Sequence, residues 1–225
     1  MNTELLAADK PADLNRAAAL LQQGALVAVP TETVYGLAAN AADPTAVAKI
    51  FQAKGRPADH PLIVHIPDLA MLEQFAIKIP ATAYQLAAAF WPGPLTLLLH
   101  KAPDVSPVVT GGLETIGIRM PAHPALLALL QQARLAVAAP SANPYKKLSP
   151  TRASQVLHGM AGKIAAVLDG GPCEHGLEST IVDLTGEQIQ ILRSGPISAT
   201  QLEQVLGCRV KTPLQHHVKV SGNVG

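Results

Sequence analysis

The sequence has few cysteines, few aromatic residues and little excess charge. Two of its 225 residues are cysteines, Cys173 and Cys208, which make neither a disulfide framework nor, by themselves, a zinc site. Aromatic residues make up 3% and hydrophobic residues 48% of the chain, so aliphatic side chains must fill a sizeable core. The net charge is +1, without the basic excess of strong nucleic-acid binders. We therefore expect any part in RNA chemistry to be indirect.

A membrane-spanning segment is also missing. The longest apolar stretch, residues 126–139, is interrupted by Gln131, Gln132 and Arg134, and a span needs about 20 predominantly apolar residues. The first residues include Glu4 and carry no long apolar run, so we expect no signal peptide. These features predict a cytoplasmic protein without a membrane partner.

The familiar motifs of nucleotide, zinc and hydrolase sites are absent. The nearest approach to GxxxxGK[ST] is residues 171–176, where Leu177 and Glu178 follow in place of Lys and Ser or Thr. The sequence therefore has no P-loop. No GxGxxG follows a predicted strand, and HExxH, CxxC and GxSxG are missing, which makes dinucleotide-binding folds, zinc hydrolases and α/β-hydrolases poor candidates. We expect no protein-held metal site.

Hydrophobic periodicity predicts an α/β domain with a mixed, partly antiparallel sheet. The predicted helices cover 12–23, 44–54, 69–75, 81–90, 124–133 and 198–206, and another begins at Ser149-Pro150-Thr151. The predicted strands cover 25–29, 62–66, 95–100, 116–120, 135–139, 165–169, 180–184 and 188–192. We expect one domain over residues 1–211 and a linker or tail over residues 212–225, where periodicity ends.

Polar loops follow several of these strands, and the first is residues 30–36. It carries Thr31, Glu32, Thr33 and Tyr35 at the carboxyl end of a strand, where open α/β sheets bind ligands. Such groups suit a small polar ligand. They would equally suit a turn whose hydroxyls satisfy backbone donors.

Cationic side chains are the second indication of a ligand-binding site. Lys54 and Arg56 flank Gly55 at the end of a predicted helix and can converge on one anion, although cations at a helix C-terminus are favoured in any case. Arg119 lies in an apolar strand, where an unpaired charge is costly. A substrate carboxylate or a structural Asp or Glu would be its partner. Arg193, at a strand end, could contact phosphate or form a surface ion pair.

Nine segments in order resemble the YrdC-like threonylcarbamoyl-AMP synthase family. They are PTETVYGL (30–37), KGRP (54–57), HPLIVHI (60–66), WPGPLTLLL (91–99), IGIRMPAHP (116–124), APSAN (139–143), LSPT (148–151), ESTIVDL (178–184) and ILRSGPI (191–197). The similarity covers roughly residues 12–210. It implies the family's twisted sheet with flanking helices and a concave polar cleft.

The resemblance implies a nucleotidyltransferase. Such an enzyme joins L-threonine, bicarbonate and ATP into threonylcarbamoyl-AMP and pyrophosphate, with Mg²⁺ accompanying the ATP. A separate transferase complex then modifies the adenosine beside the tRNA anticodon. By position, Thr33, His65, Arg119, Ala139 and Ser179 would contact threonine, and Arg56, His60, Thr115, Ser141, Ser149 and Arg193 would contact ATP. Lys54 and Arg56 would be the catalytic pair that neutralises the phosphates.

One departure and two alternatives accompany this resemblance. The family usually has asparagine where this chain has His60, and histidine titrates near neutrality. A carbamoyltransferase of hydrogenase maturation contains a similar domain, but those chains add zinc-finger and acylphosphatase regions. The alternative of another class is a non-enzymatic module that binds double-stranded RNA or tRNA, against which the low net charge argues. A weak tRNA contact is compatible with the enzyme.

Overall fold

The computed structural model describes residues 1–213. Its strands are β1 Glu4–Ala7, β2 Val27–Val29, β3 Gly36–Asn40, β4 Ile63–His65, β5 Ala76–Ile77, β6 Leu95–Lys101, β7 Thr115–Arg119, β8 Val137–Ala138, β9 Ala166–Asp169, β10 Thr180–Asp183 and β11 Gln190–Arg193. Its helices are α1 Pro11–Gln22, α2 Pro44–Lys54, α3 Leu72–Phe75 with the 3₁₀ turn Leu69–Met71 before it, α4 Ala81–Phe90, α5 Pro107–Thr110, α6 Pro124–Ala133, α7 Ala153–Met160 and α8 Ala199–Leu206.

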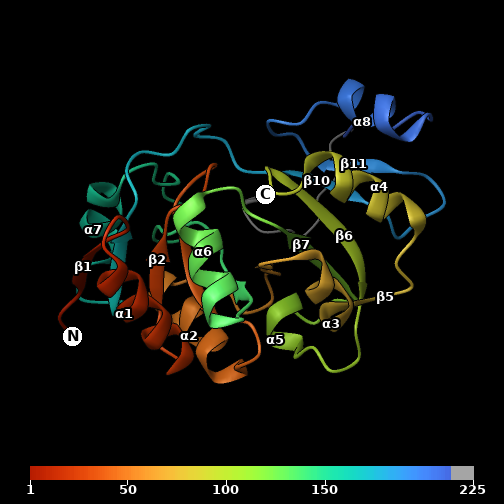
Figure 1. The fold of residues 1–225 in the computed structure, drawn as a ribbon. Coiled ribbons are helices and arrows are strands. Elements are labelled where there is room, and N and C mark those ends of the chain that lie inside the picture. Colours follow the sequence, from red (N-terminus) through yellow and green to blue (C-terminus); the bar gives the residue numbers. More distant parts are fainter. Residues whose placement is uncertain (214–225) are drawn as a thin grey trace.

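The described strands form one mixed sheet. Its order is β1-β9-β2-β3-β8-β4-β7-β6-β10-β11, with β5 paired to β6. The pairs β1/β9, β2/β9, β4/β7 and β6/β10 are parallel, and the other pairs are antiparallel. In Figure 1, β1 and α7 lie at one end of the molecule, and α4 and α8 lie at the other. The predicted α/β class with a mixed sheet is confirmed.

Alternation along the strands divides the core between the two faces of the sheet. Val27 and Val29 belong to one buried cluster, and Ala28 between them belongs to another. This period of two is what a strand buried on both faces requires. Helices α1 and α6 pack together over the Val27 side (Figure 1), with Leu21 and Leu130 fully buried between them and the sheet.

Capping residues set several helix ends where the sequence predicted them. The Asp43 carboxylate accepts hydrogen bonds from the backbone N–H groups of Thr45 and Ala46, at 3.1 and 3.2 Å, at the start of α2. Gly55 ends that helix in the left-handed region with φ 66°, which glycine adopts without steric cost. The bounds of α4 and α6 also match their predictions.

Other predicted elements were wrong or missing. The helix expected at Ser149-Pro150-Thr151 is α7, which begins later, after Arg152 as N-cap. Thr151 instead donates its backbone N–H to the Gln155 side chain at 2.7 Å. The strand predicted over 135–139 is shortened to β8. Elements β1, β3, β5 and α5 were not predicted; β3 consists of Gly, Leu, Ala and Asn, residues that mostly disfavour strands outside a tertiary context.

The predicted domain boundary falls where the description of the chain ends. Lys211 still belongs to the sheet region, because its N–H donates to Ile189 O at 2.9 Å and its carbonyl accepts from Ile191 N at 2.8 Å. The predicted linker or tail over 212–225 lies, from residue 214 onward, outside the described residues. No helix in the described part is long and apolar enough to cross a membrane.

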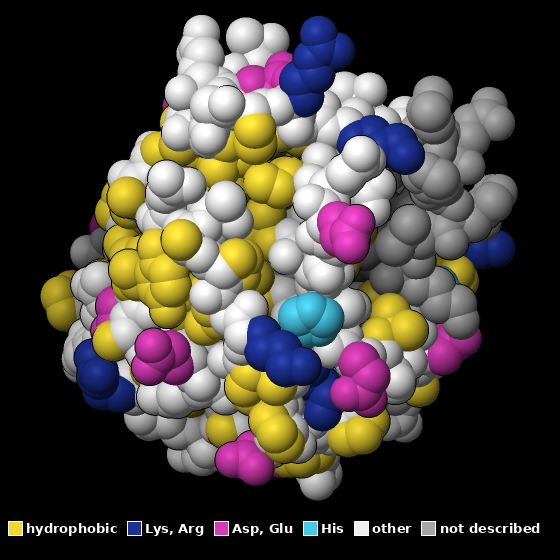
Figure 2. All heavy atoms as spheres, turned by 90° about the vertical axis from the view of Figure 1, so that its right-hand side faces the viewer, with side chains coloured by type: hydrophobic (Ala, Val, Ile, Leu, Met, Phe, Trp, Pro, Cys, Tyr) yellow, Lys and Arg dark blue, Asp and Glu magenta, His cyan; other side chains and the backbone are white. Residues whose placement is uncertain are grey.

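Charged side chains of both signs are mixed on the face at the α4 and α8 end of the molecule. Figure 2 shows hydrophobic side chains gathered in one area of this face, with Lys, Arg, Asp and Glu scattered around it. Nucleic-acid binding relies on a clear basic surface that meets many phosphates. The residues described on this face form no such continuous basic stripe.

Candidate active site

Two parallel strands place the first pair of predicted site residues side by side. His65 ends β4, Arg119 ends β7, and the two residues are partners in the parallel register. The carboxyl ends of parallel strands lie at the same edge of a sheet, which explains why residues 54 positions apart meet. The predicted location of polar residues at strand ends is confirmed here.

A carboxylate of the protein pairs with Arg119. Arg119 is 2% exposed and its Nη1 donates to Glu32 Oε1 at 2.7 Å. The other Glu32 oxygen accepts from the backbone N–H of Ala122 at 2.9 Å. Of the two partners that the sequence left open for Arg119, the structure shows the structural carboxylate. Such a partner offsets much of the cost of burying a guanidinium.

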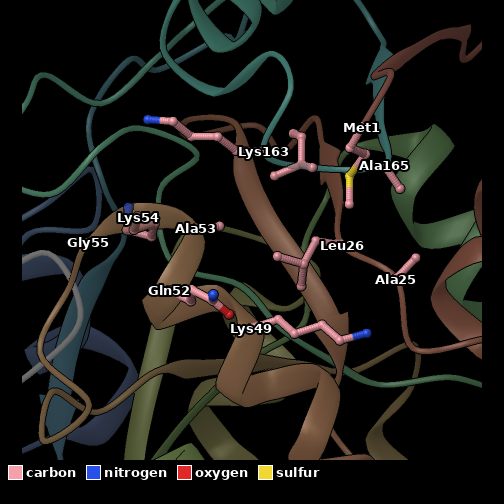
Figure 3. Close-up of a pocket in the computed structure, with 11 residues that line it drawn as sticks. Met1, Ala25, Leu26, Lys49, Gln52, Ala53, Lys54, Gly55, Lys163 and Ala165 are labelled. Atoms are coloured by element: carbon pink, nitrogen blue, oxygen red, sulfur yellow. The ribbon is translucent and has the colours of Figure 1, made fainter.

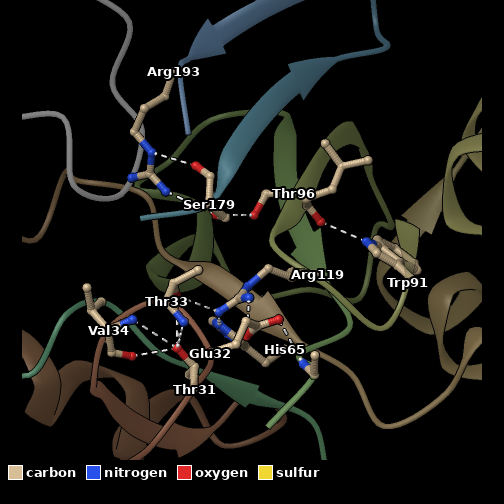
Figure 4. A network of polar contacts seen from close by, with 12 residues as sticks. Thr31, Glu32, Thr33, Val34, His65, Trp91, Thr96, Arg119, Ser179 and Arg193 are labelled. Carbon is tan, nitrogen blue, oxygen red and sulfur yellow. Dashed lines mark hydrogen bonds and ion pairs between the residues drawn. The ribbon is translucent and has the colours of Figure 1, made fainter. Parts of the chain in front are cut away.

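The second guanidinium nitrogen of Arg119 points to two more predicted residues (Figure 4). Arg119 Nη2 donates to Thr33 Oγ1 at 3.2 Å and lies 3.4 Å from His65 Nε2. Burial, together with the Arg119 charge, lowers the pKa of His65 to about 3. His65 is therefore neutral; the tautomer that donates from Nδ1 to Ile63 O, 3.2 Å away, leaves Nε2 as an acceptor.

The two hydroxyls of the loop after β2 have different parts. Thr31 Oγ1 accepts from the N–H groups of Thr33 and Val34, both at 3.1 Å, and donates to Val34 O at 2.5 Å. Thr31 thus satisfies backbone groups of a turn. Thr33 Oγ1 contacts Thr31 Oγ1 at 2.8 Å and Arg119, so it belongs to the site.

A second polar network joins β10, β11 and β6 (Figure 4). Arg193 donates from Nε to Ser179 O at 3.0 Å and from Nη2 to Ser179 Oγ at 3.1 Å. Ser179 Oγ is hydrogen-bonded to Thr96 Oγ1 at 2.7 Å. Arg193 also pairs with Glu178 at 3.5 Å. Close approach of the 194–196 backbone to this segment requires glycine at 195, since a Cβ there would lie 2.5 Å from Glu178 O.

The end of α2 places two cations in a buried position. Lys54 Nζ donates to Ser141 O and to Asn143 O, the latter at 2.7 Å. Burial, with a smaller effect of the Arg56 charge, lowers the pKa of Lys54 to about 7. Arg56 donates from Nη2 to Pro61 O at 3.2 Å, and its buried Nε has no partner among the described residues. An unsatisfied buried donor of this kind calls for an acceptor.

The described residues line two adjoining pockets. The first, which we call the Arg119 pocket, is lined by Thr31, Thr33, Val34, Gly36, Ile63, His65, Arg119, Ala139, Pro140, Ser141, Glu178, Ser179 and Arg193. The second, the Lys54 pocket, is lined by Lys54, Arg56, His60, Ser141, Asn143, Tyr145, Lys146, Lys147, Ser149 and Glu178. Ser141 and Glu178 line both pockets, which makes the two pockets neighbours.

The two pockets contain nearly all the predicted site residues, divided as predicted for threonine and ATP except at Ser141 and Arg193. Ser141, predicted for ATP, lines both pockets. Arg193, also predicted for ATP, lines the Arg119 pocket. Thr115 lines neither; it begins β7 and pairs with His100. Its predicted contact with ATP stays a prediction.

Sequence reasoning named Glu32 only among the polar groups of the loop 30–36 and assigned no role to Glu178. Both stood inside segments that the analysis quoted, next to residues that it did select. A buried Arg119 demanded a carboxylate, and Glu32 is the carboxylate of the polar loop that follows β2. For Glu178 the signal was weaker, because only the fold brings residue 178 next to residues 54, 141 and 193.

A larger hollow lies on the other side of α2 (Figure 3). Its volume is about 630 Å³, and its lining includes Leu26, Lys49, Gln52 and Lys163. Lys54 is the one predicted site residue that also borders it. The hollow thus lies apart from the network around Arg119, and we assign the reaction to the two smaller pockets.

Comparison with known proteins identifies the family. The family model for Sua5, YciO and YrdC, described as telomere recombination, matches residues 19–195. The chain belongs to the Sua5/YciO/YrdC family. This membership confirms the resemblance found in the nine sequence segments.

Curated relatives of the chain carry one activity in their names. A threonylcarbamoyl-AMP synthase of Bacillus subtilis is 50% identical over 206 residues, which are 91% of this chain and 59% of that protein. A threonylcarbamoyl-AMP synthase of Pyrococcus abyssi is 51% identical over 191 residues, which are 85% of this chain and 56% of that protein. The chain therefore spans a little under three fifths of the length of these relatives.

Solved structures show the same fold. P. abyssi Sua5 in complex with L-threonine superposes with a TM-score of 0.90 at 45% identity, covering 95% of this chain and 63% of that one. Escherichia coli YciO superposes with a TM-score of 0.79 at 21% identity, covering 90% of this chain and all of that one, a likeness that concerns the fold alone. The twisted mixed sheet predicted for a YrdC-like domain is confirmed.

Proposed function

We propose that this chain is an L-threonylcarbamoyladenylate synthase. It would form threonylcarbamoyl-AMP and pyrophosphate from L-threonine, bicarbonate and ATP. The observation that carries the proposal is the pair of adjoining pockets, one built around Arg119 and the other around Lys54 and Arg56. An acyl adenylate is made where an oxygen nucleophile meets the α-phosphorus of ATP, and adjoining sites for an amino acid and a triphosphate supply that meeting.

The Arg119 pocket suits threonine. Arg119 offers a guanidinium held in place by Glu32, and guanidinium binds carboxylate well. Thr33, neutral His65 and Ser179 add hydroxyl and imidazole groups for the substrate hydroxyl and carboxylate. Ala139 also lines this pocket. P. abyssi Sua5, with which this fold superposes, has been solved with L-threonine bound.

The Lys54 pocket suits the triphosphate. Lys54, Arg56, Lys146 and Lys147 line it with four cations, and Ser141 and Ser149 offer hydroxyls. Phosphate would accept from the Arg56 Nε that has no partner in the described protein. The main catalytic effect is then positioning and neutralisation of charge as pyrophosphate leaves.

Mg²⁺ is expected to arrive with the ATP. In such sites the ion keeps several waters and is held largely by phosphate oxygens and one or two carboxylates. Within residues 1–213, no group of three His, Cys, Asp or Glu side chains could hold a metal ion. The Lys54 pocket is lined mainly by cations and hydroxyls, so the ion would be held by phosphate oxygens of the nucleotide and by water.

The reaction begins with capture of CO₂, derived from bicarbonate, by the threonine amine. The resulting carbamate oxygen attacks the α-phosphorus, and pyrophosphate leaves. The product would pass, in the cytoplasm, to a transferase complex that modifies tRNA; tRNA itself would contact this chain weakly. An RNA-binding module without activity is not favoured, because cations of the site lie buried in pockets instead of on an open basic surface.

The experiment that tests the function is a substrate-dependence assay. Pyrophosphate release is measured with ATP and bicarbonate, in the presence of L-threonine, L-serine, glycine or no amino acid. We expect release that depends on L-threonine. Equal release in all tubes, or none in any, would refute the proposal, and a salt-dependent RNA gel shift without turnover would favour the RNA-binding module.

A further inference from the structure

Glu178 lies where the two pockets meet. Among the described residues, Ser141 and Glu178 alone line both the Arg119 pocket and the Lys54 pocket. Any reaction that joins the contents of the two pockets must take place beside these residues. Glu178 is also the one carboxylate among the described lining residues of either pocket. It is therefore placed to act on the group that passes between them.

The other nearby carboxylate, that of Glu32, already has a hydrogen-bond partner at each oxygen. Both oxygens of Glu32 are used, at 2.7 Å by Arg119 and at 2.9 Å by the N–H of Ala122, and the side chain is 6% exposed. Glu178 differs, because its side chain is 23% exposed and its contact with Arg193 is longer, at 3.5 Å. A loosely held carboxylate can exchange one cationic partner for another at little cost.

We propose that Glu178 binds the ammonium group of the amino-acid substrate and accepts its proton, an inference that rests on the proposed function. The proposed function puts the threonine carboxylate at Arg119, and Glu178 lines the same pocket; we therefore place the ammonium group beside Glu178. An ammonium group cannot attack CO₂ until one N–H bond breaks and leaves its electron pair on nitrogen. Glu178 takes that proton.

Both protons that leave the threonine nitrogen have an acceptor. Glu178 passes the first proton to bicarbonate, which loses water to give CO₂. The nitrogen pair then forms the N–C bond, and a pair of the C=O bond moves to oxygen. A second N–H proton leaves the nitrogen for the Glu178 carboxylate, which releases it to water through its exposed side. The product is a carbamate anion beside the α-phosphorus.

The surrounding cations agree with this role. The Glu178 charge acts on three of them, since it raises the pKa of Lys54, Arg56 and Arg193 against the lowering effect of burial.

The test compares Glu178→Gln with a matched control, Glu174→Gln. Glu174 lies in the same loop, is exposed and lines neither pocket. Calorimetry gives the affinity for L-threonine and for its deamino analogue, 2,3-dihydroxybutanoate. We expect Glu178→Gln to lose roughly 10- to 100-fold in affinity for threonine with no change for the analogue. Glu178→Asp should recover part of the loss, and the control should match the parent protein.

A pH profile adds a readout that a merely structural role would not move. Glu178→Gln should lower threonine-dependent pyrophosphate release by about 10²- to 10⁴-fold near neutrality. The deficit should shrink as pH rises toward the pKa of the amine, because solvent then removes the proton. A deficit that is the same at every pH would overturn the role in proton transfer.

The binding experiment separates this inference from the proposed function. Equal losses for threonine and its analogue, or a loss for ATP alone, would overturn the ammonium contact. If the parent protein binds threonine but releases no pyrophosphate, the proposed function fails while the binding comparison still decides the contact. If the parent protein does not bind threonine, both fail.

Discussion

The two pockets differ in how their positive charge is compensated. In the Arg119 pocket, Arg119 has Glu32 as a buried partner at 2.7 Å, and its other contacts are hydroxyl and imidazole groups. In the Lys54 pocket, Lys54 and Arg56 are nearly as buried, yet Lys54 donates to backbone carbonyls and Arg56 Nε has no partner among the described residues.

This difference separates a preformed site from a site that awaits an anion. The Arg119 pocket is held rigid by the protein's own ion pair, so its geometry does not depend on a ligand. In the Lys54 pocket, Glu178 is the one carboxylate among the described lining residues, against Lys54, Arg56, Lys146 and Lys147. Its positive charge is therefore only partly compensated, which costs stability until phosphate binds. Strained or unsatisfied groups of this kind gather at functional sites.

The largest expected effect comes from breaking the compensated pair. Arg119→Met leaves Glu32 buried without its partner, which should lower the free energy of unfolding by about 3–5 kcal/mol. Urea unfolding followed by circular dichroism measures it. Arg134→Met is the matched control, because the Arg134–Asp68 pair is exposed and should contribute at most about 1 kcal/mol. Similar losses in both variants would remove the distinction.

Replacing a cation of the Lys54 pocket should weaken ligand binding and leave stability unchanged or higher, unlike the replacement of Arg119. Arg56→Met is expected to weaken ATP binding by roughly 10- to 100-fold, the value of a charge-assisted hydrogen bond. Its stability without ATP should be unchanged or higher, because an unsatisfied buried donor is lost. Isothermal titration calorimetry and urea unfolding of the same samples measure both quantities. A clear loss of stability would show that Arg56 is already compensated.

The pKa of Lys54 provides a further test of the difference between the two pockets. Because burial lowers it to about 7, much of Lys54 is neutral above that pH in the protein without nucleotide. Phosphate favours the charged form, so ATP binding should take up a proton, and affinity should fall by up to about tenfold per pH unit as pH rises above about 7. Calorimetry in buffers of different ionisation heat measures the uptake.

Lys54→Met provides the control for this experiment. The variant lacks the titrating group, so the proton uptake assigned to Lys54 should disappear along with its share of ATP affinity. Unchanged proton uptake in Lys54→Met would assign the titration to another group. The absence of uptake in the parent protein would contradict a neutral Lys54.

The smallest effect is expected at His60, which lines the Lys54 pocket beside Tyr145. His60→Asn introduces the residue that the family resemblance led us to expect at this position. Stability should change by no more than about 0.5 kcal/mol, and ATP affinity near pH 8 should change only a few-fold. A large change in either quantity would show that His60 has a role of its own in the Lys54 pocket.

Local patterns predicted much of the fold because local chemistry determines it. Asp43 and Gly55 set both ends of α2 through a side-chain cap and a left-handed residue. The predicted start of α7 was wrong because Ser149 and Thr151 resemble helix caps. Tertiary contacts instead direct this segment to the Lys54 pocket. The Gly- and Ala-containing β3 has little strand propensity of its own and forms because β2 and β8 flank it.

The candidate site, like the fold, could be predicted from the sequence only in part. Arg119 could be singled out because a charge in an apolar strand demands an anionic partner, but the sequence left open whether that partner is a substrate carboxylate or a structural Asp or Glu. The partner is Glu32, and this could not be predicted because it depends on how the fold brings the loop after β2 to the end of β7. The junction role of Glu178 depends on four segments coming together, and no spacing along the chain encodes that.

The most direct test of the proposed activity follows the carbon of bicarbonate. The protein is incubated with ¹³C-bicarbonate, L-threonine and ATP, and the products are analysed by mass spectrometry. We predict a species that contains threonine, AMP and one labelled carbon, and that forms only when all three substrates are present. Conversion of ATP to AMP or ADP without any labelled adenylate would contradict the account.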